Sequence, residues 1–301
     1  WTQVKNITST IMTEGGFKLF GSYAGLFEIA NEYNSEVILD AQYRPTSREH
    51  QMMYVFLPPT LGGYSQLSPL QELVDSYIML DGKTIKETGT SFDESHPYAN
   101  RDPRLKATVM YTGNSYTLAD GTEVVINCEK GEGKDGYGVG SDCSATGYYI
   151  KKYWDNTYRA TLYSGLNPIL IRYADILLMN AEALAELGEL DKTAWDATIK
   201  PIRDRAGFTL ASALEFPEGA SKDKLIEIVR NERRSELALE GHRHKDIIRW
   251  RIADNVLNGW CHGLKTNDVV GTDDGYVRVE NRTFNANKHY LWPIPQDRKS
   301  V

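Results

Sequence analysis

The alternation of apolar and polar residues is most regular in the C-terminal half of the chain. Residues 168–187 and 191–206 repeat apolar side chains every three or four positions, which predicts two helices that meet at Gly188. A third helical segment is predicted through 225–250, with an interruption near Gly241. The first two helices have the spacing of one tetratricopeptide-type repeat, although an ordinary helical hairpin fits the same pattern.

The third helical segment carries charge on the face that should be buried. Counted from Leu225 at the helical period, that face collects Val229, Glu232, Glu236, Leu239, Arg243, Asp246 and Trp250. An unpaired buried carboxylate is costly. We therefore expect Glu232 and Glu236 to be buried and bound to arginines, with Arg172 and Arg203 as the expected partners. The alternative is a solvated charged face that aligns with Leu225 by chance.

The N-terminal half predicts short strands, short helices and long loops. Strands are expected at 36–43, 104–111, 123–128 and 148–154. A helix is expected over 2–13, and Ser68-Pro69 should open another. Beyond residue 252 the chain should be irregular, apart from a short strand at 289–294. We therefore divide the chain into a mixed part with ligand-bearing loops (1–166), a helical part (167–251) and an irregular tail (252–301).

Composition narrows the function classes. The net charge of −7 argues against nucleic acid and against an anionic membrane surface as partners. No run of 18 apolar residues is present, so no membrane span is predicted. The chain starts at Trp1 without a signal peptide, and we interpret it as a fragment or a processed chain. A Cys128–Cys143 disulfide and free thiols are both compatible with the cysteine spacing.

The sequence contains no recognisable catalytic or metal-binding signature. His-Glu-x-x-His, Gly-x-Ser-x-Gly and a phosphate-binding loop are all absent. Carboxylates such as Glu240 fall in helical charge ladders beside arginines, which indicates a structural role. Asp273-Asp274-Gly275 fits a polar turn better than a cation site. We therefore expect no enzyme activity, no metal and no cofactor.

Aromatic side chains in loops are the better functional lead. The chain has 18 Tyr and 6 Trp, and sugar rings stack on such faces. The candidate ligand-binding residues are Tyr54, Tyr64, Gln66, Tyr98, Trp154 and Tyr158. Tyr64 leads because Pro58-Pro59 stiffen its loop and Gly62-Gly63 permit a sharp reversal just before it. Trp154 or Tyr98 would supply a second face. Packing in the core is the alternative role for each ring.

The helical part also resembles a known family. The segment NERRSELALEGHRHKDIIRW resembles the signature of the SusD/RagB family of surface nutrient-binding lipoproteins. Further segments are similar to family motifs in the same order along the chain: NEYNSEVILDAQY, RDPRLKATV, LIRYADILLMNAEAL, IRDRAG and HYLWPIPQ. The resemblance runs from about Ala30 to Gln296.

The resemblance implies a predominantly α-helical fold with small β-elements, tetratricopeptide-type helical hairpins and long loops. It implies a non-catalytic protein that captures an oligosaccharide and hands it to a SusC-like TonB-dependent transporter. Such a protein is a surface-exposed lipoprotein of the bacterial outer membrane, with its lipid anchor and a helical N-terminal half outside this chain. The alternatives are peptide capture within the same family, a glycoside hydrolase, and a scaffold for protein contacts.

Overall fold

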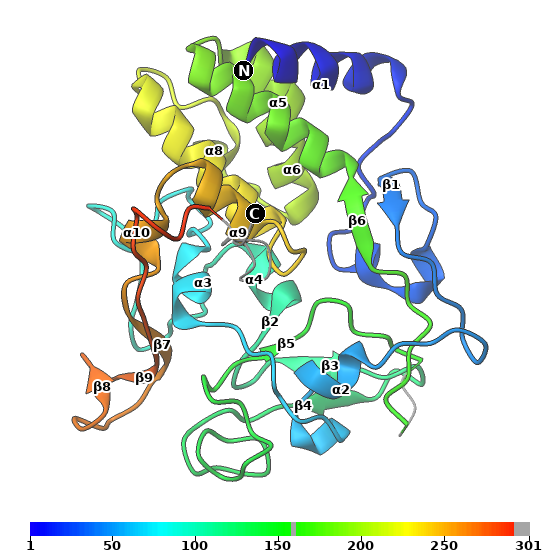
Figure 1. Cartoon of the computed structure of the whole chain (residues 1–301), viewed down its shortest axis with the longest axis vertical. Helices are drawn as coiled ribbons and strands as arrows, with labels where there is room; N and C mark the ends of the chain where they lie inside the picture. Colours follow the sequence, from blue (N-terminus) through cyan, green and yellow to red (C-terminus); the bar gives the residue numbers. More distant parts are fainter. Residues whose placement is uncertain (158–160, 292–301) are drawn as a thin grey trace, which may run out of the picture.

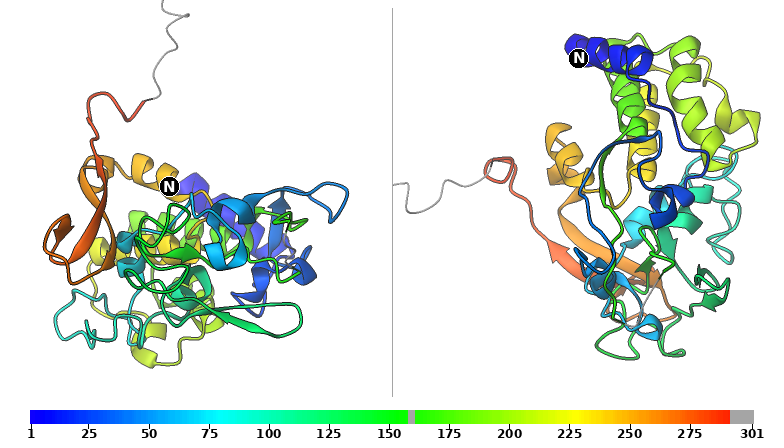
Figure 2. Two further views of the ribbon diagram at one scale, coloured as in Figure 1. Left: turned by 90° about the horizontal axis from the view of Figure 1, so that it is seen from below. Right: turned by 90° about the vertical axis from the view of Figure 1, so that its right-hand side faces the viewer.

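The computed structural model describes residues 1–157 and 161–291. Long helices gather at one end of the molecule, and small antiparallel sheets with long loops form the other end (Figure 1). Two further views show the same division (Figure 2). The predicted fold class, mostly helical with small β-elements, is therefore confirmed.

The helical end is built around one central helix. Its long helices are α1 (Thr2–Glu14), α5 (Tyr173–Leu187), α6 (Lys192–Ala206) and α8 (Lys222–Glu236). α5 packs against the other three. Gly188 ends α5 in the left-handed conformation, with φ of 73°. α6 then begins at Asp191, whose carboxylate accepts the Ala194 N–H at 2.8 Å. The predicted N-terminal helix and the predicted hairpin are both confirmed.

The first helix predicted in the C-terminal half starts later than the predicted residue 168. Residues 169–172 form strand β6 (Ile169–Arg172), and the helix begins only at Tyr173. β6 pairs antiparallel with β1 (Val37–Asp40), inside the strand predicted at 36–43. β-branched Ile169 and Ile171 favour the extended conformation, and pairing with β1 completes their backbone hydrogen bonds.

The third predicted helix is not continuous through its charged face. α8 ends at Glu236, and the short helix α9 (Arg243–Arg249) starts after a turn. In that turn Leu239 and Gly241 have φ of 63° and 83°, which no helix accommodates. The predicted interruption near Gly241 therefore begins several residues earlier. Glu232 and Glu236 share a face of α8, whereas Asp246 and Trp250 come from the next segment.

The middle of the chain differs from its predicted strands. Residues 103–108 form helix α4 (Pro103–Thr108), because the Asp102 carboxylate caps the Arg104 N–H at 2.9 Å and Pro103 suits the first turn. Only β2 (Val109–Met110) remains of the strand predicted at 104–111. The other short strands are β3 (Ser115–Thr117), β4 (Glu123–Val125) and β5 (Tyr149–Ile150). β3 pairs with β4 around a turn at Ala119-Asp120, and β2 pairs with β5.

Short helices support the loops of this half. They are η1 (Gly25–Phe27), η2 (Ile29–Asn31), α2 (Met52–Phe56), η3 (Pro59–Leu61) and α3 (Gln71–Ser76). α7 (Ala211–Leu214) and α10 (Ala253–Val256) lie further along the chain. Ser68 does not cap α3 as predicted. Its hydroxyl donates to the Ser65 carbonyl at 3.1 Å, and the helix starts at Gln71.

The tail beyond residue 252 is more ordered than predicted. It forms a three-stranded antiparallel sheet from β7 (Gly259–Lys265), β8 (Thr272–Asp273) and β9 (Tyr276–Arg282), with β9 in the middle. This sheet lies at one edge of the molecule, and β1 lies at the opposite edge (Figures 1 and 2). Of the strand predicted at 289–294, residues 289–290 form a turn, residue 291 a bend, and the rest lies outside the described residues.

A buried network of ion pairs joins the two ends of the molecule. Its centre is Glu236, whose carboxylate lies 2.6 Å from Arg172 Nη1 and 2.9 Å from Arg104 Nη1 and also binds Arg205. Glu232 lies 2.7 Å from Arg203 Nε and 2.7 Å from Arg104 Nη1. The predicted burial of both glutamates and their predicted pairing with Arg172 and Arg203 are confirmed.

Further residues complete this network, among them Glu240, which the sequence placed in a charge ladder beside arginines. Glu36 binds Arg172 at 2.7 Å and Arg205 at 2.9 Å. Glu240 binds Arg172 at 2.8 Å and the buried ammonium of Lys152 at 2.6 Å. We call the whole set the central network, and its members are Glu36, Asp102, Arg104, Lys152, Arg172, Arg203, Arg205, Glu232, Glu236 and Glu240.

The other two predicted members of the charged face lie elsewhere. Asp246 belongs to a neighbouring cluster, where it binds Arg233 and Arg249 at 2.9 Å each. Arg243 has no ion pair among the described residues, and its guanidinium lies 5.8 Å from the centre of the Trp250 ring. The break after Glu236 explains this difference, because it turns the α9 residues away from the face of α8.

The cations of the central network hold the pKa values of Glu232, Glu236 and Glu240 below their ordinary range against the effect of burial. Burial alone would raise the pKa of Glu236, but Arg205, Arg172 and Arg104 outweigh it and keep this pKa below its ordinary value. Burial lowers the pKa of Lys152 to about 8, although Glu240 opposes the shift. Each charge in the network thus depends on its partners, and deleting one leaves another buried and unpaired.

We predict that Glu232→Ala lowers the free energy of unfolding by about 3–5 kcal/mol, because Arg203 and Arg104 would each lose a buried carboxylate partner. Glu227→Ala is the matched control, since this side chain lies on the same helix and is 62% exposed. Chemical denaturation should show a large loss for the first variant and little change for the second. Equal midpoints for Glu232→Ala and the parent would contradict a structural role for the network.

Candidate ligand-binding groove

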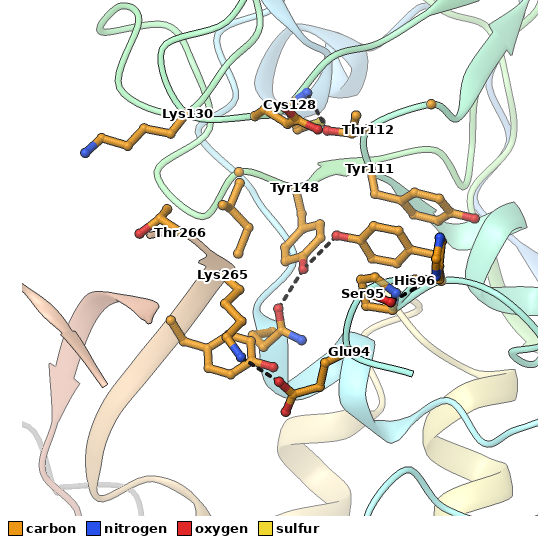
Figure 3. Close-up of a pocket in the computed structure, with 18 of the residues that line it drawn as sticks. Glu94, Ser95, His96, Tyr111, Thr112, Cys128, Lys130, Tyr148, Lys265 and Thr266 are labelled. Carbon is orange, nitrogen blue, oxygen red and sulfur yellow. Dashed lines mark hydrogen bonds and ion pairs between the residues drawn. The ribbon is translucent and has the colours of Figure 1, made fainter. Parts of the chain in front are cut away.

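A large open groove lies at the loop-rich end, beside the C-terminal sheet. Its volume is about 880 Å³, and its walls come from three segments within residues 92–132 and from the distant C-terminal sheet region (Figure 3). These segments are the loop 92–101, the turn 111–113, the stretch 128–132 and the sheet residues 264–268 with Tyr276. We call this site the groove.

Tyrosine rings form the floor of the groove. The rings of Tyr98 and Tyr111 stack with their centres 4.0 Å apart and their planes inclined by 17°. The Tyr98 and Tyr148 hydroxyls are 3.2 Å apart, and the Tyr148 hydroxyl donates to Gln71 Oε1 at 2.6 Å. Figure 3 shows this chain of hydrogen bonds as dashed lines. Packing and hydrogen bonds together fix the orientation of the rings before any ligand arrives.

Burial keeps these hydroxyls protonated. It raises the pKa of Tyr98 to about 12 and raises the pKa of Tyr148 well above its ordinary value. Burial also raises the pKa of the Cys128 thiol, which therefore stays protonated and is a poor nucleophile. The groove offers hydrogen-bonding hydroxyls and ring faces rather than reactive groups.

Four of the charged side chains around the groove form ion pairs with one another. Lys265 binds Glu94 at 2.8 Å, and Lys130 binds Asp268. Arg101 is buried beneath the loop and donates to the carbonyls of Val74, Tyr77 and Pro97. Its guanidinium therefore holds the loop that carries Tyr98.

The close approach of two segments sets the base of the groove. Leu264 of β7 donates its N–H to the Thr146 carbonyl at 2.7 Å. A Cβ atom on Gly147 would lie 1.7 Å from Leu264 Cδ2, and Gly147 has a φ of 74°. Only glycine fits this position, so Gly147 lets the sheet lie against the segment that presents Tyr148.

Of the predicted ligand-binding residues that the structure describes, only Tyr98 lies in the groove. Tyr54 and Tyr64 form a separate pair with ring centres 4.3 Å apart, and Tyr64 is 40% exposed. Gly62 adopts the left-handed conformation expected for the reversal before Tyr64, with φ of 82°. Gln66 is exposed two residues further on. This aromatic pair does not line the groove.

The Trp154 ring packs inside the protein and does not present a face to a ligand in the groove. Its side chain is 8% exposed, and its indole N–H donates to the Thr117 carbonyl at 2.9 Å. The ring packs against Tyr116, with ring centres 5.0 Å apart, and borders a smaller cavity of about 430 Å³. Tyr158, the last predicted candidate, lies outside the described residues.

Sequence reasoning missed most of the groove. Tyr111, Tyr148 and Tyr276 stand beside or within short strands, where a core position is the usual expectation. No local pattern relates them, because Tyr276 is brought to Tyr111 by the C-terminal sheet, which was predicted as irregular. The one available signal was the density of tyrosine in loops and strand ends.

The structure contains no preformed metal site within the residues that it describes. The Asp273 carboxylate accepts a hydrogen bond from Arg278 and contacts His262, which agrees with the polar turn predicted at 273–275. The three cysteines are free thiols. None of the described helices has the length and apolar character needed to cross a membrane.

Comparison with known proteins places these features in a family. The model of the SusD family matches residues 26–300. The SusD-like protein P2 of Formosa agariphila is 26% identical over 98% of this chain and 56% of its own length. A second protein of that organism, SusD-like protein P38, is 36% identical over 35% of this chain and 21% of its own length.

Solved structures give the same result. A SusD-like carbohydrate-binding protein from Bacteroides fragilis superposes with a TM-score of 0.84 and 30% identity, covering 99% of this chain and 60% of that protein. A second SusD-like protein from the same species gives a TM-score of 0.75 and 27% identity, over 98% of this chain and 60% of its own. The chain therefore spans about three fifths of these structures and at most 56% of the two curated relatives.

Proposed function

The chain belongs to the SusD family, and we propose that it captures an oligosaccharide in the groove beside its C-terminal sheet. The stacked rings of Tyr98 and Tyr111 carry the proposal. Stacked tyrosines with fixed hydroxyls present both the flat apolar faces and the polar groups that sugar rings require. The carbohydrate-binding protein from Bacteroides fragilis, which is 30% identical over 99% of this chain, supports the same ligand class.

Capture would take place at the bacterial cell surface as the first step of import. In this proposal the protein is an outer-membrane lipoprotein that passes its ligand to a SusC-like TonB-dependent transporter. The groove supports such a role because it is open and lined by preset groups, so a ligand can enter and leave without unfolding of its walls.

We propose that the site is not catalytic. A glycoside hydrolase needs two carboxyl groups, one of them kept protonated near neutral pH. In the groove, Glu94 is bound to Lys265. The hydrogen bond from Lys130 holds the pKa of Asp268 below its ordinary value, opposite to the shift that a general acid requires. The groove is thus better suited to holding a sugar than to cleaving one.

Tyr276→Ala should weaken oligosaccharide binding several-fold, because one ring face of the groove is lost and such a face contributes on the order of 1 kcal/mol. A panel of oligosaccharides would first identify a ligand, and isothermal titration calorimetry would then compare the variants. Tyr33→Ala is the matched control, since Tyr33 is 65% exposed and does not line the groove. A normal affinity for Tyr276→Ala would rule out the groove as the main site.

The exposed pair of Tyr54 and Tyr64 is proposed as a second contact surface. Tyr64→Ala should reduce affinity for long oligosaccharides several-fold with little effect on the melting temperature, because the ring is partly exposed. Binding of short and long ligands should be measured alongside thermal unfolding. A variant that binds normally but melts early would show that Tyr64 serves packing instead.

Prolonged incubation with a bound oligosaccharide should leave the sugar intact. Chromatography of the mixture over many hours should show only the starting material, as for a sample without protein. Steady release of shorter products would favour the hydrolase alternative, provided that Glu94→Gln or Asp268→Asn abolishes it.

A further inference from the structure

His262 lies between two carboxylates from different elements. Its Nδ1 atom is 2.7 Å from Glu72 Oε1 on α3, and its Nε2 atom is 3.0 Å from Asp273 Oδ2 on β8. The backbone N–H of His262 also donates to Glu72 Oε1, at 3.1 Å. Both ring nitrogens of one imidazole on β7 therefore face acidic oxygens.

Only the imidazolium form satisfies this arrangement. A neutral imidazole has one N–H, and its other nitrogen is an acceptor. An ionised carboxylate is also an acceptor only, so one of the two contacts would then be unfavourable. Protonated His262 donates to both Glu72 and Asp273, and the three side chains form a continuous chain of opposite charges.

The surrounding charges agree with a cation at this position. On β9, Arg278 donates to the other oxygen of Asp273 at 2.9 Å, which leaves Oδ2 for His262. On α8, the guanidinium of Arg234 binds the backbone carbonyl of Glu72 rather than its carboxylate. Glu280 pairs with Arg282 at 2.8 Å, further along β9. The Glu72 carboxylate thus has His262 as its closest cation.

This chain of charges holds one wall of the groove. β7 carries His262 and also Lys265, and β9 carries Tyr276 opposite Lys265. On α3, Glu72 follows Gln71, which binds the Tyr148 hydroxyl at the floor of the groove. His262 therefore links the element that supports the floor to the sheet that forms the wall.

We propose that protonated His262 is a clamp that positions the sheet wall of the groove, so that ligand affinity decreases when His262 loses its proton. The effect on ligand rests on the proposed function of the groove, whereas the clamp itself does not. His262 is a positioning residue in this proposal, because it acts through Tyr276 and Lys265 and does not line the groove itself.

The direction of the pH dependence follows from the contacts. Burial disfavours the charged ring, but the hydrogen bonds to Asp273 and Glu72 outweigh it and raise the pKa of His262 above its ordinary value. The clamp is complete below the ordinary pKa of about 6.5 and is lost as the pH rises through the raised value. The partners are partly exposed, so the change in affinity should be modest, roughly two- to fivefold.

The clamp can be measured without any ligand. The imidazole resonances of His262 should titrate above those of a free histidine, and the protection of the β8 and β9 amides, relative to their intrinsic exchange rate at each pH, should decrease across the same pH range. In Glu72→Gln, the amide can donate to a neutral ring nitrogen and still accept from the backbone N–H of His262. Protection in this variant should depend much less on pH. A His262 that titrates normally, or an exchange profile unchanged by Glu72→Gln, would overturn the clamp.

The link to binding is tested with the oligosaccharide that the panel identifies. Affinity of the parent should fall two- to fivefold as His262 deprotonates, and His262→Gln should bind weakly with a flat profile. His96→Gln is the required control, because His96 is a second histidine that lines the groove and contacts a carboxylate, Asp93. A pH dependence that disappears with His96→Gln and persists with His262→Gln would refute the proposal. If no oligosaccharide binds, the proposed function fails, while the ligand-free exchange data still decide the clamp.

Discussion

The fold depends on the burial of charge at the contact between its two ends. Glu236 is fully enclosed and lies against three arginines, from α4, β6 and α6. Such a group cannot be left unpaired in the interior, so each of these elements must be in place for the others to be stable. The network therefore disfavours misassembled structures, because a misplaced helix would leave a buried charge without its partner, at a high cost of desolvation.

The central network also explains how long loops are held without much regular structure. Through Arg104 and Lys152 it reaches the segments before β2 and after β5, which are the two strands beside Tyr111 and Tyr148. The floor of the groove therefore rests on the same buried charges that join the helices. The C-terminal sheet is attached differently, by the backbone contact at Leu264 and by partly exposed ion pairs such as that of His262. Buried charges therefore hold one side of the groove, whereas partly exposed ion pairs hold the side formed by the C-terminal sheet.

Local sequence patterns predicted those features that depend on neighbouring residues. The hairpin, its glycine end and the acidic face of α8 follow from helical periodicity, and two arginine partners were correctly identified. Arg104, Arg205 and Glu36 were not identified. Only the folded chain brings Arg104 and Arg205 to Glu236, and Glu36 to Arg205. The helical segment predicted through 225–250 is interrupted near Gly241 as expected, but the break begins earlier, because Leu239 also adopts a positive φ in the turn after Glu236. The groove itself could not be predicted, since one of its walls is a sheet that lies more than a hundred residues from the other lining segments and that periodicity did not show.

The location of sugar in a crystal structure of the protein with its oligosaccharide tests the central claim most directly. The account predicts sugar rings in the groove, with one ring against the stacked pair of Tyr98 and Tyr111 and others toward Tyr276. It also predicts that the tyrosine side chains keep their present orientations, because hydrogen bonds through Tyr148 and Gln71 already fix them. Sugar bound elsewhere, with the groove empty, would contradict the account.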